Sequence, residues 1–208
     1  MITVHVVDDE PELRRALARV LESGGYRVRA CASADEFLDG LQETMSGCVL
    51  LDVAMPGIDG LALQEKLRVV APHLPIVFLT GRGDIAMSVR AMKSGAVDFL
   101  TKPVRRADLL RAVRTAVERA EQSRLEHERI ESARAKATRL TPREREVMQH
   151  VLAGRLNKII ADRLGTAEGT VKVHRARLME KLGLDSVPDL VRFAELAGIS
   201  PAADRDDE

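Results

Sequence analysis

The stretch that decides the fold is CVLLDVAMPGIDG, from Cys48 to Gly60. Four apolar residues lead directly into Asp52, and a proline and two glycines follow within the next eight positions. An unpaired carboxylate inside an apolar core is costly, so Asp52 must lie at a strand end or be compensated by a cation. The stretch therefore predicts a buried strand whose carboxyl end carries a functional aspartate, Asp52.

Four other short apolar segments share this character and alternate with segments of helical spacing. They read ITVHVV, YRVRAC, LPIVFLT and AVDFLT. Between them apolar residues recur every three or four positions, as Leu13, Leu17 and Leu21 do, which is typical of amphipathic helices. Strands that alternate with helices predict an α/β domain, with a doubly wound, five-stranded parallel sheet covered by helices on both faces.

Polar residues stand where four of these five strands end. Asp8 and Asp9 follow the first strand, Asp52 ends the third, Thr80 ends the fourth and Lys102 follows the fifth. The carboxyl ends of parallel strands share one edge of the sheet, where such folds bind ligands. Any single acid at a strand end is more often an ordinary solvated residue, and it is the set of five that points to a site.

The chemistry of that edge favours a cation and a phosphoryl group. Neighbouring carboxylates repel one another unless a cation lies between them, and oxygen ligands suit Mg²⁺. An aspartate beside such a metal can act as a nucleophile toward phosphorus. Lys102 would then neutralise the acquired phosphoryl group, and the Thr80 hydroxyl would bond one of its oxygens.

A second domain begins at LTPREREV. Thr141 is a good N-cap, Pro142 suits the first helical position, and Glu144 completes a capping box. The segments NKIIADRLG and TAEGTVKVHRARLMEKLG read as helix, glycine-containing turn and helix. This pattern predicts a compact all-α domain of four short helices with helix-turn-helix geometry, whose second helix enters the DNA major groove.

The second helix of that motif divides into an inward and an outward face. At about 100° per residue, Val171 and Leu178 point inward. Lys172 is the best candidate for a base edge, and Val173 and Ala176 are small enough to touch thymine methyl groups. The alternative is an ordinary solvated basic face. The residues predicted to contact DNA, mostly through phosphates, are Asn157, Lys158, Thr170, Lys172, Val173, Arg175, Ala176, Arg177 and Lys181.

The segment between the domains is rich in Glu, Arg and Ala and lacks Gly and Pro. Its apolar stripe is dense up to Val117 and then thins to Leu125 and Ile130, which favours a solvated helical linker over a short coiled coil. The predicted organisation is a phosphoacceptor domain at 1–119, a helical linker at 120–138, a DNA-binding domain at 139–200 and an acidic tail at 201–208.

Composition limits the remaining possibilities. The net charge of zero conceals −3 in residues 1–104, +3 in 105–138, +3 in 139–203 and −3 in 204–208, which places any polyanionic partner in the second half of the chain. Cys31 and Cys48 lie in apolar segments, so buried free thiols are expected. No apolar run approaches the roughly 20 residues of a membrane span, and no signal peptide is recognisable. A cytoplasmic protein without a membrane partner is predicted.

The first half of the chain resembles the receiver domain of two-component response regulators. The residues that carry the resemblance are VVDDE, LLDVAMPGIDG and VFLTGRGDIAMSVRAMKSGAVDFLTKP. The resemblance implies a flavodoxin-like fold, phosphorylation by a sensor histidine kinase, and Mg²⁺ as cofactor. The implied residues are Asp52 as the phosphorylation site; Asp8, Asp9, Asp52 and the Ala54 carbonyl as metal ligands; Thr80 and Phe99 as switch residues; and Lys102 as phosphate-binding residue, followed by a cis bond to Pro103.

The second half is similar to the LuxR-type DNA-binding domain of the FixJ/NarL family, and the whole chain is closest to the FixJ subfamily. The matching blocks are LTPREREV, NKIIADRLG and TVKVHRARLMEKLG. The resemblance implies that phosphorylation produces a homodimer through the fourth helix, fifth strand and fifth helix of the receiver. It also implies binding to promoter DNA and activation of transcription with RNA polymerase as a partner.

Two other classes of function fit the sequence less well. A phosphatase of the haloacid-dehalogenase type would carry a second aspartate two residues after Asp52, where this chain has Ala54. The chain also lacks the GxxxxGK[ST] loop of an ATPase. A DNA-binding protein that ignores phosphate is the other alternative, which the complete acidic edge disfavours. The sequence therefore predicts a regulator and not an enzyme.

Overall fold

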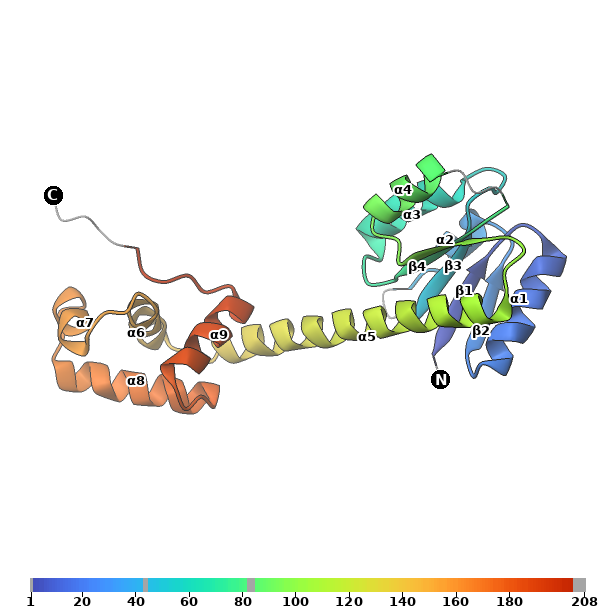
Figure 1. Cartoon of the computed structure of the whole chain (residues 1–208). Helices are drawn as coiled ribbons and strands as arrows, with labels where there is room; N and C mark the ends of the chain where they lie inside the picture. Colours follow the sequence, from blue (N-terminus) through green and yellow to red (C-terminus); the bar gives the residue numbers. More distant parts are fainter. Residues whose placement is uncertain (1, 43–44, 82–84, 204–208) are drawn as a thin grey trace. The chain divides into compact units, whose positions relative to one another are not determined.

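The computed structural model describes residues 2–42, 45–81 and 85–203. The last five residues of the predicted acidic tail, 204–208, lie outside this description. The chain divides into two compact units, Met1–Arg124 and Leu125–Glu208 (Figure 1).

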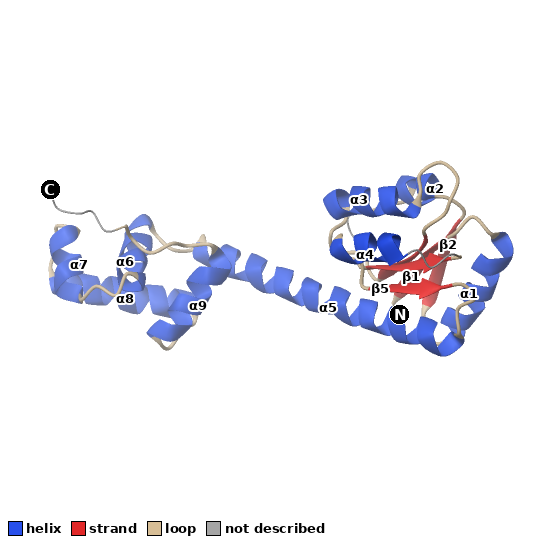
Figure 2. Ribbon diagram, turned by 45° about the horizontal axis from the view of Figure 1, so that its top comes forward, coloured by secondary structure: helices blue, strands red, loops and turns tan. Residues whose placement is uncertain are grey.

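The first unit is a five-stranded sheet with helices on both faces, as the sequence predicts (Figure 2). All the strand pairs are parallel, in the order β2-β1-β3-β4-β5. The elements are β1 (Thr3–Val7), α1 (Pro11–Ser23), β2 (Arg27–Cys31), α2 (Ala34–Asp39), β3 (Cys48–Asp52), α3 (Gly60–Val70), β4 (Ile76–Thr80), α4 (Ile85–Lys93), β5 (Asp98–Thr101) and α5 (Arg106–Ala137).

The central strands are buried on both faces, which explains their continuous apolar character. Successive residues alternate sides: Leu50 packs toward α1 and α5, whereas Leu51 packs toward α2, α3 and α4. Both cysteines are free and buried, as predicted. Because β2 is an edge strand, most of its residues are at least partly exposed.

The strand order places the acids on either side of a topological switch point. Strand β1 lies between β2 and β3, so the connections that leave β1 and β3 run to opposite faces of the sheet and open a crevice between them. Asp8 follows β1, and Asp52 is the last residue of β3. Gly60 lets α3 start against this strand end, because a Cβ atom there would lie 2.2 Å from the Asp52 carbonyl oxygen.

Helix α5 extends beyond the part that packs in the core of the first unit. It continues without a break from Arg106 to Ala137 and so contains almost all of the predicted linker. Leu109 and Val113 belong to the core of the first unit, whereas Ala133 and Ala137 belong to the core of the second. The thinning apolar stripe correctly indicated a helix, but it gave no sign that the helix ends in a buried contact.

The second unit is entirely helical in its described part. Its helices after α5 are α6 (Pro142–Leu152), α7 (Asn157–Arg163), α8 (Glu168–Leu182) and α9 (Val187–Ala197). The predicted capping box is present, with Thr141 and Glu144 bonded reciprocally. Met148, Ile160 and Leu178 join α6, α7 and α8 in one apolar core. Over the described residues of the whole chain, no helix is both long and apolar enough to cross a bilayer.

Candidate functional site

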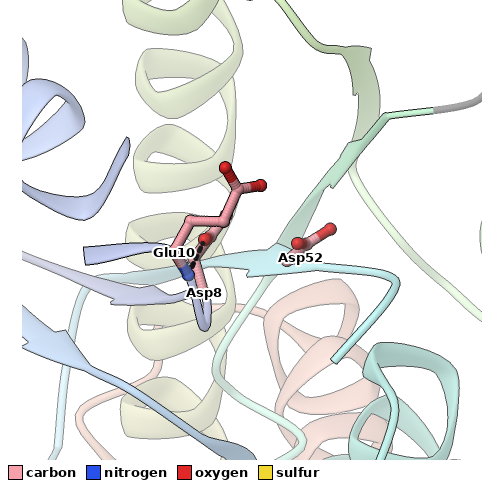
Figure 3. A group of neighbouring side chains, drawn as sticks. All are labelled: Asp8, Glu10 and Asp52. Atoms are coloured by element: carbon pink, nitrogen blue, oxygen red, sulfur yellow. Dashed lines mark hydrogen bonds between the residues drawn. The ribbon is translucent and has the colours of Figure 1, made fainter. Parts of the chain in front are cut away.

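Three carboxylates meet at the carboxyl edge of the sheet. Oxygens of Asp8, Glu10 and Asp52 lie within 4.8 Å of one another (Figure 3). Asp8 and Asp52 are buried, with 0% and 3% of their surfaces exposed, whereas Glu10 is exposed. The Glu10 backbone N–H donates to Asp8 Oδ1 at 2.8 Å, which fixes the turn after β1. Two buried acids this close together require a cation.

Lys102 supplies that cation from the end of β5. Its Nζ donates to Asp52 Oδ2 at 2.7 Å, to Asp8 Oδ2 at 2.8 Å and to Glu10 Oε1 at 3.2 Å. Burial by itself would lower the pKa of Lys102, but the bonds to Asp52 and Asp8 outweigh it and raise that pKa. Burial raises the pKa of Asp52, against the opposing pull of Lys102. The ammonium is therefore held in its charged form beside Asp52.

The other residues predicted for this edge lie around the cluster. Thr80 is buried at the end of β4, and its backbone pairs with Thr101 of β5. Phe99, half-buried on β5, packs against Phe78 with ring centroids 6.0 Å apart. The Lys102–Pro103 peptide bond is cis, which confirms the expectation.

Two of the predicted metal ligands, Asp9 and Ala54, place no carboxylate in the acidic cluster. Asp9 is exposed and is not a member of the acidic cluster found among the described residues. Glu10, two positions after Asp8, joins that cluster instead, because alternate residues of an extended segment point the same way. The Ala54 N–H donates to Asp52 Oδ1 at 3.3 Å and so helps to orient that carboxylate.

Helix α8 of the second unit presents the outward face that the sequence predicts. Val171, Leu178 and Leu182 are buried, and Glu168 is its first residue. His174, on the same helix, is half-buried. The predicted DNA contacts on α8 that are exposed are Thr170, Lys172, Val173, Ala176, Arg177 and Lys181.

Side chains of the helix-turn-helix segment also bond to one another. Arg175 Nη1 donates to Asn157 Oδ1 at 3.2 Å and joins α8 to the start of α7, so these two residues are partly engaged within the fold. Lys172 forms an exposed ion pair with Glu168, 3.0 Å long and one turn away. Ala167 gives α8 no capping side chain, unlike Thr141 at α6.

The sequence of each half matches a known family. Residues 4–114 match the family described as "Response regulator receiver domain". Residues 138–194 match the family described as "Bacterial regulatory proteins, luxR family". The chain belongs to the two-component response regulators with a LuxR-type DNA-binding domain.

Full-length relatives support this membership. The response regulator is 44% identical over 204 residues to transcriptional regulatory protein FixJ of Azorhizobium caulinodans, which covers 98% of this chain and 96% of FixJ. It is 43% identical over 192 residues to response regulator protein TmoT of Ectopseudomonas mendocina, covering 92% and 87%. Among solved structures, response regulator StyR has a TM-score of 0.82 at 41% identity, covering 93% of this chain and 98% of StyR.

A solved full-length FixJ from B. japonicum is also similar, with 38% identity and a TM-score of 0.57 over 94% of this chain and 97% of that one. These findings confirm the predicted α/β receiver and helical DNA-binding domain. They also confirm the predicted class of function, since the family consists of transcriptional regulators of two-component systems. A sensor kinase and promoter DNA are the partners that these two domains imply.

The structure gives Lys181 of the response regulator a contact within the fold, in addition to the predicted phosphate contact. Its Nζ lies 2.7 Å from Oε2 of Glu144, whose side chain is only 4% exposed. Burial would raise the pKa of Glu144, but the bonds from Lys181 and Thr141 outweigh it and lower that pKa. Lys181 therefore anchors α8 to the capping box of α6. The sequence does not indicate that Lys181 and Glu144 are in contact, because 37 positions separate them.

Substitution of Lys181 by alanine is expected to destabilise the DNA-binding domain by about 1–2 kcal/mol at pH 7, between the values for exposed and buried ion pairs. A carboxyl whose folded pKa is lowered contributes stability above its unfolded pKa and loses it as the pH falls through the folded value. The difference between the variant and the wild type should therefore shrink below about pH 4.

Hydrogen exchange of α6 and α8 in the full-length protein, compared at pH 7 and after acidification, measures this difference. A loss of stability that is equally large at both pH values would contradict the assignment to Glu144.

Proposed function

We propose that Asp52 accepts a phosphoryl group from the phosphohistidine of a sensor kinase. A P–O bond to Asp52 forms as the P–N bond to the histidine breaks. The observation that carries the proposal is the position of Asp52 at the switch point, 2.7 Å from the Lys102 ammonium. A fixed positive charge at that distance stabilises the negative charge that a phosphoryl group brings. The Thr80 hydroxyl, at the neighbouring strand end, would bond one phosphoryl oxygen.

The donor set fits Mg²⁺. Asp8, Asp52 and Glu10 offer hard carboxylate oxygens that lie within 4.8 Å of one another. We propose that Asp8, Asp9, Asp52 and the Ala54 carbonyl hold the ion, with Glu10 adding its charge. When bound, Mg²⁺ supplies electrostatic neutralisation of the phosphoryl oxygens. Lys102 would stay beside Asp52, where its ammonium lies 2.7 Å from Oδ2.

Phosphorylation would act on the rest of the receiver through Thr80 and Phe99. Thr80 moves toward the phosphoryl group, and Phe99, which packs on Phe78, follows it. Helix α4 carries two large apolar side chains on its surface, Val89 and Met92, which are 46% and 47% exposed. We propose that α4, β5 and α5 form the surface through which two phosphorylated receivers dimerise, because apolar groups gathered on a surface favour association.

The output would be transcriptional activation at promoters with paired half-sites. The receiver spans 1–119, the helical linker 120–138, the DNA-binding domain 139–200 and the tail 201–208. DNA contacts are assigned to Asn157, Lys158, Thr170, Lys172, Val173, Arg175, Ala176, Arg177 and Lys181. The uncapped first turn of α8 supports a phosphate contact. RNA polymerase would be the partner at the promoter, and the cytoplasm the place of action. No catalytic turnover is proposed.

The test of this function is the affinity for promoter DNA with and without phosphorylation. Full-length protein is treated with acetyl phosphate and Mg²⁺, and its binding to DNA selected by the phosphorylated protein is followed by fluorescence anisotropy. Tighter binding after treatment is expected. Equal affinity before and after a verified phosphorylation would show that the protein binds DNA without regard to phosphate.

Two substitutions on α8 should separate base recognition from phosphate binding. Lys172→Ala is expected to reduce discrimination between the selected sequence and a mismatched one by about 1–3 kcal/mol. Arg177→Ala should weaken binding to both sequences alike and lower the salt dependence of binding by about one counterion. Titrations at two salt concentrations measure both effects. An equal loss on the two sequences for Lys172→Ala would remove it as a base contact.

A further inference from the structure

A polar side chain is buried between α3 and α4, away from the phosphorylation site. Gln64 of α3 is 3% exposed, and the other buried residues of this helix include the apolar Leu63 and Leu67. Its Nε2 donates to the Ala91 carbonyl at 3.1 Å and to the Ser94 carbonyl at 3.3 Å. A buried amide is costly unless it is bonded, and leucine would fill this position without that cost. We therefore attribute the role of this amide to the two hydrogen bonds that it donates.

Both bonds go to the end of α4. The last carbonyls of a helix have no partner within the helix. Here Ala96 N–H bonds back to the Ala91 carbonyl at 3.1 Å, and Gly95 N–H to the Met92 carbonyl at 3.0 Å. Gly95 has φ +94°, which belongs to a left-handed helix end. Gln64 supplies a second donor to this cap and ties it to another helix.

A neighbouring exposed contact strengthens the same connection. The Ser94 hydroxyl donates to Glu65 Oε1 at 3.2 Å. Helix α3 is itself fixed at its start. Gly60 lies against the Asp52 carbonyl, and the Gly60 N–H donates to the Val53 carbonyl. The C-terminal end of α4 is thus tied to a helix that rests on the phosphoacceptor strand.

We propose that Gln64 is a positioning residue of the switch. It holds the C-terminal end of α4 on α3, so that a displacement beginning at Thr80 turns α4 about this fixed end and does not shift the whole helix. Val89 lies on the turning part and is repositioned by the rotation, whereas Met92 lies in the tied end, between the two residues whose carbonyls Gln64 bonds. This inference rests on the proposed phosphorylation switch. It adds the fixed point about which α4 turns.

The first test needs no phosphorylation. Gln64→Leu is compared with Leu63→Met, a substitution at the adjacent buried position of α3 that removes no bond to α4. Hydrogen exchange of the full-length protein is measured peptide by peptide. In Gln64→Leu, the amides at the end of α4 and at Gly95 and Ala96 are expected to exchange about tenfold faster, the value of one to two lost hydrogen bonds. In Leu63→Met any increase should be spread over the receiver.

The second test measures coupling at equal phosphorylation. Wild type and both variants are brought to the same phosphorylated fraction with acetyl phosphate and Mg²⁺, and the dimer fraction is measured by light scattering. Gln64→Leu is expected to form several-fold less dimer than wild type, whereas Leu63→Met should match wild type.

Exchange in α4 that rises no more in Gln64→Leu than in Leu63→Met would overturn the tie itself. An unchanged dimer fraction in Gln64→Leu would overturn its role in the switch. If phosphorylated wild type formed no dimer, the proposed switch would fail, whereas the exchange data would still decide whether Gln64 holds α4.

Discussion

Replacement of Lys102 by methionine is expected to lower the free energy of unfolding of the receiver by about 3–5 kcal/mol in the absence of divalent cations. The Lys102 side chain is 14% exposed and bridges the side chains of Asp8 and Asp52, which are 0% and 4% exposed. Without the ammonium, two buried carboxylates face each other uncompensated. Methionine keeps the apolar length of the lysine, so the loss is electrostatic and not a packing defect.

Mg²⁺ should restore much of the stability lost in Lys102→Met, because a cation bound only to the folded state stabilises it and lies between the same carboxylates. Urea unfolding of wild type and variant, with EDTA or with Mg²⁺, measures both quantities. Arg105→Met is the control, since it breaks an ion pair with Asp108 in which the arginine is exposed. A small loss for Lys102→Met, or a loss that Mg²⁺ does not reduce, would contradict the charge arrangement described here.

Asp52→Asn is expected to abolish phosphorylation while the receiver stays folded. The amide is no nucleophile toward phosphorus, so incorporation from acetyl phosphate should fall by about 100-fold or more. Asparagine has nearly the size of aspartate and can still accept a hydrogen bond from Lys102. Phosphate incorporation measured by intact-mass spectrometry, beside a circular dichroism spectrum, checks both parts of the prediction.

A matched control for Asp52→Asn lies seven residues along the chain. Asp59 caps α3 by accepting a bond from the Ala62 N–H at 2.7 Å, and asparagine is an equally good cap. Asp59→Asn should therefore accept the phosphoryl group as wild type does. Incorporation that persists in Asp52→Asn would mean that another acid is the acceptor.

The edge of the sheet was predictable because strand ends are local features. Each of Asp8, Asp52 and Thr80 follows its own apolar run, and the parallel arrangement brings those ends together whatever the details of packing. The same holds for the capping box of α6 and the buried face of α8. These are short-range patterns that sequence periodicity records directly.

What the sequence did not reveal depends on contacts between distant segments. Glu10 reads as a residue of a solvated turn until Lys102, 92 positions away, is placed beside it. Lys181 reads as one of several exposed cations until Glu144 proves to be buried beneath it. Gln64 reads as the polar side of an amphipathic helix, and only the packing of α4 shows that it is enclosed. In each case the sequence shows a charged or polar residue but does not show which distant residue it contacts.

The most direct test of the central claim is the mass of the protein in solution before and after phosphorylation. Gel filtration with light scattering is carried out on wild type and Asp52→Asn, each with and without acetyl phosphate and Mg²⁺. We expect the mass of the wild type to double with the phosphodonor and that of Asp52→Asn to stay at the monomer value. A wild type whose mass does not change, or an equal increase in both proteins, would contradict a switch that operates through Asp52.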